Sequence, residues 1–341
     1  MPALYTLPQI QHVLPSNTYN AIIQSIANGF ALLHQQQVQL APVVHLGPFS
    51  SHQIDDACIK AGYITQQEHF VIKIATGGFA SNLRLGLPTA DGLMVVFSQK
   101  TGQCEGILLD EGWLTDMRTA AAGAVAARLL APTGVQHIGM IGTGIQARFQ
   151  LQLLKLVHTC RSVLLWGRNK ERTLAAKHDI EQLGFTVELA PSIQYLCHHS
   201  RFIVTTTSST SPLLKNEWVQ PGTHITAVGA DGIGKQELDP LILQRASAVV
   251  CDEIQQCVSF GETSHAVQAG LLKKEDVLGL GELVVRERNN NKWKRQNLTD
   301  ITVFDSTGVA VQDVSIASLT LSLLKESSRA GNGGNGGMSK L

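Results

Sequence analysis

The spacing of apolar residues divides the chain into two parts with different patterns. In the first part, apolar side chains recur at helical spacing over residues 16–38, which predicts an amphipathic helix. Short runs rich in β-branched residues follow, separated by Gly and Asp, and they predict a mixed sheet. The expected strands are residues 39–46, 57–64, 69–75, 93–98 and 105–109. An alanine-rich helix is expected at residues 114–130, where Pro132 and Gly134 end it.

The second part alternates strand-like and helix-like segments, as in a doubly wound parallel sheet. Six strands are expected to begin at Val135, Ser162, Phe185, Phe202, His224 and Ala248. A further strand is expected at residues 301–304, followed by a helix at residues 309–326. Because the six strands already account for a sheet of this type, that helix is expected to return to the first part of the chain.

The pattern therefore predicts an α/β protein in which a Rossmann-type, doubly wound parallel sheet accompanies a mixed α+β domain. The parallel sheet is expected within residues 132–305. The mixed domain is expected to combine residues 1–131 with residues 306–328. Residues 329–341 are rich in Gly and Asn and are expected to form a flexible tail.

A glycine turn joins the first strand of the second part to its first helix. Gly142 allows a tight turn, Gly144 lets backbone N–H groups approach a pyrophosphate, and Ala147 lets helix and strand pack closely. A plain structural turn is the alternative to this dinucleotide site. The residues expected to contact the dinucleotide here are Gly142, Thr143, Gly144, Ile145 and Gln146.

The end of the next strand indicates which dinucleotide is preferred. Sites specific for NAD usually carry Asp or Glu about 20 residues beyond the glycines, where it binds both ribose hydroxyls. This chain has Gly167 at that place, followed by Arg168, Asn169 and Arg172. Because these side chains offer positive charge and donors to a 2′-phosphate, NADPH is the expected cofactor, with NADH as the other candidate. A solvated basic turn is the alternative interpretation.

Polar and small residues also follow two later strands of the parallel sheet. Thr206 and Thr207 follow the fourth strand, and Val228 and Gly229 follow the fifth. Ligands of open parallel sheets bind at the carboxyl ends of the strands, so these four residues are expected to line the cofactor cleft. For the threonines, an ordinary Thr-rich strand end is the alternative.

Composition narrows the class of partner. The 341 residues contain 27 basic and 27 acidic side chains, so nothing indicates binding of nucleic acid or of an anionic membrane. The expected partner is a small molecule. The six cysteines are scattered without a CxxC pair and without histidines at metal-ligand spacing, which suits reduced thiols and predicts no metal site.

The ends of the chain bear on localisation. No signal sequence and no membrane span is expected from the apolar runs, and the protein is expected to be cytoplasmic. The last three residues, Ser339-Lys340-Leu341, match a peroxisomal address, which would apply only in a eukaryote. A chance tripeptide is the alternative.

Three polar residues in apolar surroundings are candidates for chemistry. Lys73 lies within a strand of apolar neighbours, so it either points into a cleft or extends from an edge of the sheet. Arg118 lies among small helical residues, where a guanidinium suits bidentate binding of a carboxylate or an ordinary surface ion pair. Asp231 follows a strand end, where a carboxylate suits either proton transfer to a nitrogen or a tight turn.

Four motifs together resemble the ornithine cyclodeaminase and mu-crystallin family, over a stretch from about Ala41 to Lys325. They are Leu-Thr-Asp-Met-Arg-Thr-Ala-Ala at residues 114–121, Ile-Gly-Thr-Gly-Ile-Gln-Ala at 141–147, Ala-Val-Gly-Ala-Asp at 227–231 and Phe-Asp-Ser-Thr-Gly-Val-Ala-Val-Gln-Asp at 304–313. The resemblance implies a homodimer whose first domain holds the substrate and the dimer sheet, together with a Rossmann domain. Members include ornithine cyclodeaminase, ketimine reductases that act on cyclic imino acids, and an alanine dehydrogenase.

The resemblance also implies roles for single residues. Lys73 and Arg118 match a lysine and an arginine that hold the substrate carboxylate, and Arg118 is also expected to contact the cofactor. Asp231 matches an aspartate that acts on the substrate nitrogen, and Thr89 resembles a residue beside the nicotinamide. The segment from Ser306 to Gly308 resembles a loop that closes over the nicotinamide ring, and both residues are expected to contact the substrate.

Three departures from the family pattern argue against ornithine cyclisation. The cyclodeaminases carry an extra arginine where this chain has Pro-Val-Val-His at residues 42–45, and a glutamate where it has Lys60. Lys60 therefore replaces an acid by a base and is expected to join the cations that hold the carboxylate. The cyclodeaminases also use NAD in a closed redox cycle, whereas Arg168 and its neighbours indicate NADP(H).

The sequence therefore predicts an NAD(P)H-dependent oxidoreductase that acts on CH–NH groups. The expected reaction converts Δ1-pyrroline-2-carboxylate to L-proline, with Δ1-piperideine-2-carboxylate to L-pipecolate as a sister activity. Lys60, Lys73 and Arg118 are expected to hold the carboxylate, and Asp231 to keep the ring nitrogen protonated. The alternatives are an ornithine cyclodeaminase that releases ammonia, an alanine dehydrogenase, and a mu-crystallin-like binding protein.

Overall fold

The computed structural model describes residues 2–47 and 56–333. The tripeptide at residues 339–341 that matches a peroxisomal address lies outside the described residues, so the expected address stays a prediction. The chain forms two compact units. Unit 1 comprises Met1–Arg118 with Ala310–Leu341, and unit 2 comprises Thr119–Val309. The chain thus divides at residues 118/119 and 309/310, compared with the 131/132 and 305/306 suggested by the sequence pattern. The function of each unit stays a prediction.

Unit 1 is built on a seven-stranded sheet with the order β1-β7-β6-β5-β4-β2, in which β3 also pairs with β4. Strands β4 to β7 form an antiparallel meander, and β1 runs parallel to β7. The strands are β1 (Ala3–Thr6), β2 (Val38–Leu40), β3 (Val44–Leu46), β4 (Asp56–Ile64), β5 (His69–Gly77), β6 (Asp91–Ser98) and β7 (Cys104–Leu109). The mixed sheet expected from the sequence is confirmed.

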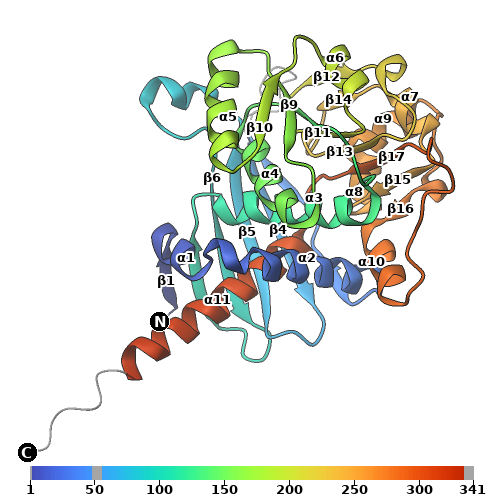
Figure 1. The fold of residues 1–341 in the computed structure, drawn as a ribbon. Coiled ribbons are helices and arrows are strands. Elements are labelled where there is room, and N and C mark those ends of the chain that lie inside the picture. Colours follow the sequence, from blue (N-terminus) through green and yellow to red (C-terminus); the bar gives the residue numbers. More distant parts are fainter. Residues whose placement is uncertain (1, 48–55, 334–341) are drawn as a thin grey trace, which may run out of the picture. The chain divides into compact units, whose positions relative to one another are not determined.

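Helices cover one face of this sheet. Helix α2 (Tyr19–His34) packs against α11 (Ala310–Gly333), which also packs against β4 and β5 (Figure 1). A side chain at Gly62 of β4 would press against Ala310, so this glycine lets helix and strand approach closely. Because side chains alternate across a strand, Lys73 of β5 points to the covered face, and it is buried there.

The remaining helices of unit 1 are short, except for α3 (Trp113–Leu130), which begins in unit 1 and continues into unit 2. They are α1 (Leu7–Val13), the 3₁₀ turns at Ser16–Thr18 and Ala80–Leu85, and the start of α3. The helix expected at residues 16–38 is too long, because Gln36 has a φ of 58° and Val38 already belongs to β2, where it pairs with Ile64 of β4. The single strand expected at residues 39–46 is two strands, since Pro42 has no N–H group to continue the ladder.

Unit 2 is built on an eight-stranded parallel sheet with the order β10-β9-β8-β11-β13-β17-β15-β16. The strands are β8 (Ile138–Ile141), β9 (Ser162–Trp166), β10 (Thr186–Leu189), β11 (Phe202–Thr205), β13 (His224–Ala227), β15 (Ala248–Cys251), β16 (Leu278–Gly279) and β17 (Thr302–Asp305). A separate parallel pair joins β12 (Thr210–Leu214) to β14 (Gln236–Leu238).

Helices lie on both faces of the parallel sheet, because successive residues of its strands enter two different cores. Ile203 of β11 packs with Leu196 and Ile242 in one core, and Val204 packs with Leu151 and Ile180 in the other. The first core is lined by α6 (Ile193–His199), α7 (Pro240–Arg245), α8 (Ile254–Phe260) and α9 (Glu262–Gln268), and the second by α4 (Ile145–Val157) and α5 (Lys170–Gln182). The doubly wound Rossmann-type fold is therefore confirmed.

The prediction that six strands account for this sheet is wrong. Strand β17, which follows all the others in the chain, pairs with β13 on one side and with β15 on the other. Val303 and Phe304 are fully buried, as expected for a strand covered on both faces. The first strand is also shorter than expected, because β8 begins at Ile138 and not at Val135.

The other helices of unit 2 are α10 (Leu280–Arg288) and the 3₁₀ turns at Asn216–Trp218 and Lys274–Asp276. In the part of the chain that the structure describes, no helix combines the length and the apolar character that a membrane span requires.

Candidate functional site

Four charged side chains are buried on the covered face of the unit 1 sheet. Lys60 on β4 and Lys73 on β5 are directly opposite one another in the antiparallel pair, so they point to the same face. Arg118 lies in α3, and Asp313 lies in the first turn of α11. The exposed fractions of Lys60, Lys73, Arg118 and Asp313 are 6%, 2%, 4% and 1%. The structure thus brings together the three cations that the sequence predicted to hold a carboxylate.

Asp313 links two of these cations. Its Oδ2 atom lies 3.2 Å from Lys73 Nζ, and its Oδ1 atom lies 3.1 Å from Arg118 Nε. Arg118 Nη1 also donates to Gln312 Oε1 at 2.9 Å. One carboxylate therefore serves two buried cations. Because buried charge is costly unless it is balanced, an anionic ligand would be favoured at this cluster.

The environment of Lys73 brings its titration close to neutral pH. Burial and the nearby charge of Arg118 together lower the pKa of Lys73 to about 8, although the carboxylate of Asp313 acts to raise it. Lys60 is a smaller cause in the same direction as Arg118. Below pH 8 Lys73 is mostly cationic, which is the form that binds a carboxylate.

Asp110 is a second acid close to this cluster. It follows β7, and its Oδ2 atom accepts the N–H of Leu114 at 2.8 Å at the start of α3. Burial raises the pKa of Asp110 to about 7, although Lys73 acts to lower it. Near pH 7 Asp110 carries less than a full negative charge, so Asp313 is the main counter-charge to Lys73 and Arg118.

Asp313 was missed by the sequence interpretation, although it ends the motif at residues 304–313. A signal was present, since Asp313 is an acid in a helix whose neighbours Val311 and Val314 are fully buried and apolar. An acid at such a position needs a cation. The sequence does not say which cation, because Lys73 and Arg118 are far away along the chain.

The glycine turn of unit 2 has the geometry expected of a phosphate-binding turn. Gly142 has a φ of 118°, and a side chain there would collide with Thr206, so only glycine fits. Gly144 is the N-cap of α4, and the space where its side chain would lie is open. Backbone N–H groups at the start of α4 are therefore accessible to an anion, and Ile145 beside them is 53% exposed.

Arg148 braces this turn and was not predicted. Its Nη1 atom donates to the carbonyl groups of Thr143 and Gly144, at 2.8 and 3.0 Å. Its Nε atom donates to Asp179 of α5 at 2.7 Å. The guanidinium thus holds the carbonyls of the turn, which helps to leave the N–H groups of the turn directed toward a ligand.

A buried glutamate holds the strand ends that were expected to line the cofactor cleft. Glu237 accepts the Thr205 hydroxyl at 2.6 Å, the N–H of Thr207 at 2.6 Å and the N–H of Gly229 at 2.9 Å. A side chain at Gly229 would collide with Glu237 and with the carbonyl of Thr207. The segments after β11 and β13 are therefore fixed next to each other by Glu237, which the sequence interpretation missed.

The remaining predicted residues at these strand ends have ordinary backbone roles. Thr206 donates its N–H to the carbonyl of Ile141 at 2.9 Å, and Val228 donates its N–H to the carbonyl of Thr205 at 3.1 Å. Gln146 in the first turn of α4 accepts from Gln150 Nε2 at 3.3 Å. The bonds of Thr206 and Val228 connect the ends of β8, β11 and β13, where ligands of such sheets bind, whereas the bond of Gln146 lies within α4.

The end of β9 cannot carry an acid without rearrangement. A side chain at Gly167 would collide with Thr143 and Thr173. Arg168, Asn169 and Arg172 are exposed, and Asn169 caps α5 by accepting the N–H of Arg172 at 2.9 Å. The absence of the acid typical of NAD sites thus has a packing cause, and two exposed arginines follow Gly167 in the sequence.

A second buried acid of unit 2 holds the loop from Ser306 to Gly308. Asp252 Oδ2 accepts the Gly308 N–H at 2.7 Å and the Ser306 hydroxyl at 2.9 Å. Asp252 Oδ1 accepts the Thr307 hydroxyl at 3.2 Å. The loop that was expected to close over the nicotinamide is therefore buried and fixed by Asp252, which follows β15.

Two predicted residues lie outside these buried clusters. Asp231 is in the loop after β13, its side chain is 53% exposed, and it pairs with Lys235 at 2.6 Å. Thr89 lies in unit 1 between the 3₁₀ turn at 80–85 and β6, and its carbonyl accepts the N–H of Phe79 at 3.1 Å. Neither position tests the role that the resemblance implies.

Comparisons with known proteins agree with the motifs. The model of the ornithine cyclodeaminase/mu-crystallin family matches residues 8–328. The iminosuccinate reductase of Paracoccus denitrificans is 34% identical over 309 residues, which cover 90% of this chain and 93% of that protein. Its crystal structure in complex with NAD⁺ has a TM-score of 0.83, with coverage of 96% of this chain and 97% of that chain at 32% identity.

Two further proteins are similar over most of the chain. The structure of an archaeal alanine dehydrogenase dimer with bound NAD has a TM-score of 0.85 at 30% identity, and covers 96% of this chain and 97% of that one. A Δ1-pyrroline-2-carboxylate reductase of Bacillus cereus is 28% identical over 281 residues, which cover 82% of this chain and 84% of that protein. Oxidoreductases of imino and amino groups thus recur among the similar proteins.

Proposed function

Because this chain belongs to the ornithine cyclodeaminase/mu-crystallin family, we propose that it is a nicotinamide-dependent reductase of α-imino acids. The proposed substrate is Δ1-pyrroline-2-carboxylate, which gives L-proline, and the six-membered analogue gives L-pipecolate. In this reaction the imine carbon accepts a hydride and the nitrogen carries a proton. Imine, reduced cofactor and one proton therefore give amine and oxidised cofactor.

The observation that supports this proposal most strongly is the sharing of Asp313 between Lys73 and Arg118. Lys73 and Arg118 share one carboxylate, so the charges of these two cations are balanced when a substrate supplies a second carboxylate. Each charge-assisted hydrogen bond to that carboxylate would contribute about 1.5–3 kcal/mol. Lys60 lies directly opposite Lys73 and is proposed to strengthen the same grip.

The glycine turn supports a nicotinamide dinucleotide as the cofactor. The open space at Gly144 and the start of α4 fit a pyrophosphate, and Thr207, Val228 and Gly229 would line the remainder of the cofactor. When bound, the reduced nicotinamide supplies the hydride. The chain's own part is to orient the substrate by its carboxylate, which removes the entropic cost of alignment.

Asp231 is proposed to keep the substrate nitrogen protonated. A protonated imine accepts hydride much more readily than a neutral one, so a carboxylate beside the nitrogen favours the reaction. Its partner Lys235 is four residues away, and the side chain of Asp231 is more than half exposed. In this proposal the pair separates when the cationic nitrogen binds.

The reaction is tested with purified protein and a panel of substrates, read by the loss of reduced-cofactor absorbance. Δ1-Pyrroline-2-carboxylate and Δ1-piperideine-2-carboxylate are compared with pyruvate plus ammonia and with oxaloacetate plus ammonia, because similar proteins act on alanine and iminosuccinate. The proposal expects the highest kcat/KM with a cyclic imine. Release of ammonia from ornithine without imine reduction would replace the proposal by a cyclodeaminase.

The exchange Asp231→Asn separates an enzyme from a binding protein. A catalyst should lose most of its turnover and still bind the cofactor, because only the proton function is removed. Ser208→Ala, at another exposed strand-end position of unit 2, serves as the control. Full imine reduction by Asp231→Asn would remove Asp231 from the mechanism.

We further propose that NADPH is preferred to NADH, on the support of Gly167 and of the exposed Arg168 and Arg172. The exchange Arg168→Asp should raise the KM for NADPH about tenfold and leave that for NADH nearly unchanged, because one charge-assisted contact to the 2′-phosphate is lost. Lys273→Asp alters the charge of unit 2 equally at another exposed position. An equal rise for both cofactors would exclude this preference.

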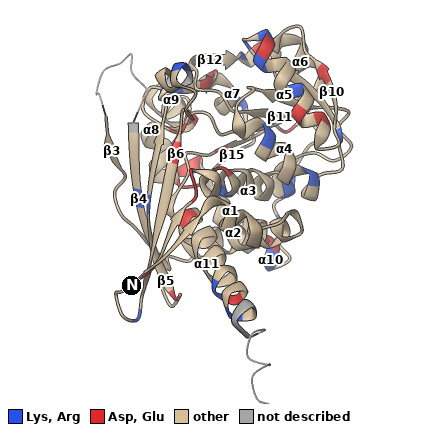
Figure 2. Cartoon of the chain, turned by 90° about the vertical axis from the view of Figure 1, so that its left-hand side faces the viewer, with Lys and Arg blue, Asp and Glu red and all other residues tan. Residues whose placement is uncertain are grey.

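We also propose that the protein is a homodimer that pairs through the outer face of the unit 1 sheet. Phe70 stacks on Tyr63 and Phe97 there, at centroid distances of 6.3 and 5.0 Å, and Ile72 lies on the same face. In Figure 2 the strands β4, β5 and β6 are mostly tan, with few charged residues. Because this face is apolar and only half-buried, a second copy would cover it.

Sedimentation equilibrium tests the dimer. Ile72→Lys should shift the protein to a monomer, whereas Leu174→Lys, at an exposed apolar residue of α5, should not. A wild-type protein that sediments as a monomer at micromolar concentration would contradict the proposal.

A further inference from the structure

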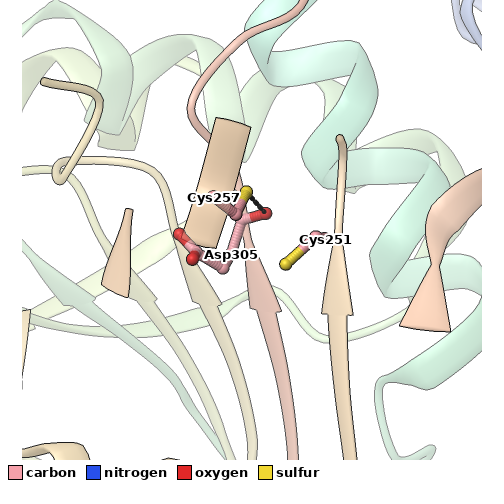
Figure 3. A group of neighbouring side chains, drawn as sticks. All are labelled: Cys251, Cys257 and Asp305. Atoms are coloured by element: carbon pink, nitrogen blue, oxygen red, sulfur yellow. Dashed lines mark hydrogen bonds between the residues drawn. The ribbon is translucent and has the colours of Figure 1, made fainter. Parts of the chain in front are cut away.

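Two cysteines and an aspartate meet at the carboxyl ends of two neighbouring strands in unit 2. Cys251 is the last residue of β15, and Asp305 is the last residue of β17 and its direct partner in the ladder. Cys257 lies in the middle of α8. Figure 3 shows the three side chains gathered at this place, although Asp305 lies 48 residues beyond Cys257 in the sequence.

The three side chains offer ligand atoms at a spacing that a single ion can bridge. The two Sγ atoms and one carboxylate oxygen all lie within 4.8 Å of one another. Tetrahedral zinc binds thiolates at about 2.3 Å and carboxylate oxygens at about 2.0–2.2 Å, so its ligand atoms lie roughly 3.3–4 Å apart. Small side-chain movements would therefore close the group around an ion.

The carboxylate of Asp305 gives independent support for a bound cation, because one of its oxygens lacks a partner in the described part of the chain. Asp305 Oδ2 accepts the N–H and the hydroxyl of Thr263, at 2.8 and 2.7 Å. Asp305 Oδ1 is buried and has no hydrogen-bond partner among the described residues. An unsatisfied buried carboxylate oxygen is costly, and coordination of a metal ion would satisfy it.

A neutral oxygen is available as a fourth ligand. Thr263 Oγ1 lies 3.3 Å from Cys251 Sγ, next to its bond with Asp305. The donor set is therefore two sulfurs, one carboxylate oxygen and one hydroxyl. Sulfur ligands favour soft and borderline ions over magnesium and calcium, which prefer oxygen ligands only.

We propose that Cys251, Cys257 and Asp305 form a structural site for one soft or borderline divalent ion of the zinc and cadmium type. The ion would tie the ends of β15 and β17 to α8. Cys257 Sγ also lies 3.2 Å from Asp252 Oδ1, the acid that holds the loop from Ser306 to Gly308. The site is thus one side chain away from that loop, and its ion would stabilise the arrangement around Asp252.

The spacing of the cysteines did not reveal this site, because Cys251 and Cys257 are six positions apart and match no usual metal motif. The expectation of no metal site rested on sequence spacing alone. The fold adds Asp305 from a strand that is last in the sheet's chain order. Since all three residues are buried, the ion would enter while the chain folds.

The site is tested on the full-length protein, produced with zinc or with cadmium in the growth medium and then freed of loosely bound metal by gel filtration. The proposal expects one metal ion per chain by elemental analysis. The cadmium form should also show the ultraviolet charge-transfer band of cadmium thiolate. Cys251→Ser and Cys257→Ser should each reduce the bound metal at least tenfold.

Cys197→Ser is the matched control, because Cys197 is equally buried in unit 2, on α6, with no role in the cluster. It should keep the full metal content and the thiolate band. Metal content below one tenth of an ion per chain would overturn the proposal, and so would an equal loss in all three variants. A disulfide between Cys251 and Cys257, seen as a mass lower by two hydrogens, would overturn it too.

A second measurement covers variants that fail to fold. The unmodified protein should have a higher Tm when it is produced with cadmium than when it is produced in metal-depleted medium, since an ion that binds only the folded state stabilises it. Magnesium should have no such effect. Equal Tm values for protein produced with cadmium, with magnesium and in metal-depleted medium would contradict the site without the use of any variant.

Discussion

The two units bury charge in opposite ways. Unit 1 buries Lys60, Lys73 and Arg118 close to the carboxylate of Asp313. Unit 2 buries acids whose partners are mostly backbone N–H groups and hydroxyls, several of them at the carboxyl ends of its strands. These acids are Glu237, Asp252, Glu262 and Asp305. The cations of unit 1 thus favour an anionic ligand, whereas the acids of unit 2 hold loops.

Two acids of unit 2, Glu237 and Glu262, show how buried acids hold the loops and strand ends of this unit. Burial raises the pKa of Glu237, and hydrogen bonds from Thr205, Thr207 and Gly229 act against it. Burial raises the pKa of Glu262 well above its ordinary range, and the nearby Glu237 raises it further. Glu262 in turn accepts the N–H groups of Glu237 and Leu238. The pair therefore fixes β14 and the strand ends next to it.

The largest expected effect is on the binding of the substrate carboxylate by Lys73 and Arg118. Arg118→Leu and Lys73→Met should each lower kcat/KM for the imine by about two to three orders of magnitude, because loss of one partner of a buried ion pair costs about 2–5 kcal/mol. The dissociation constant of the cofactor, measured by fluorescence titration, should change less than about threefold. Arg128→Leu is the control, since Arg128 lies on the same helix and pairs with Glu287. Equal losses in all three variants would contradict a specific grip.

A smaller effect is expected when a loop-holding acid of unit 2 is changed. Glu237→Gln keeps one carbonyl oxygen but replaces the other acceptor with an amide, so at least one of three hydrogen bonds is lost. The dissociation constant of the cofactor should rise about tenfold, in line with a loss of about 1–3 kcal/mol. Glu188→Gln, at an exposed residue of β10, is the control. A change in the KM for the imine, with no change in cofactor binding, would contradict the assignment of substrate binding to unit 1 and cofactor binding to unit 2.

The smallest expected effect is the pH dependence of kcat/KM compared with that of cofactor affinity. Lys73 has a pKa of about 8 and binds the substrate carboxylate in its protonated form, so kcat/KM should fall as pH rises through 8. The fall should approach tenfold per pH unit. The dissociation constant of the cofactor should show no break caused by Lys73, because Lys73 is proposed to hold the substrate and not the cofactor. Lys73→Arg should remove the break, since arginine stays charged, and a break that persists in this variant would exclude Lys73 as its source.

Local patterns in the sequence were sufficient for much of the fold and for the cations of the candidate site. A short run of apolar and β-branched residues predicted the strand that contains Lys73, and the strand-turn-helix pattern placed Gly142 and Gly144 at the start of α4. These features depend on neighbours within a few residues, so the sequence shows them directly. Val303 and Phe304 gave an equally clear strand signal, but the strand's central place in the sheet depends on the whole topology.

The residues that the sequence did not identify act across long distances in the chain. Asp313 meets Lys73 and Arg118 only after α11 packs on the unit 1 sheet. Glu237 meets three separate segments after β14 has formed beside them. A buried acid of this kind can be suspected from its apolar neighbours, but its partners are set by tertiary structure.

The central claim is that Lys73 and Arg118 bind the carboxylate of an imine that is then reduced. The most direct measurement compares wild-type protein and Arg118→Leu on Δ1-pyrroline-2-carboxylate and on Δ1-pyrroline, which lacks the carboxylate. Wild-type protein should prefer the carboxylate by about three orders of magnitude in kcat/KM, and the variant should lose most of this preference because only the carboxylate substrate is affected. An equal fall of kcat/KM on both substrates, or a wild type without preference, would contradict the account.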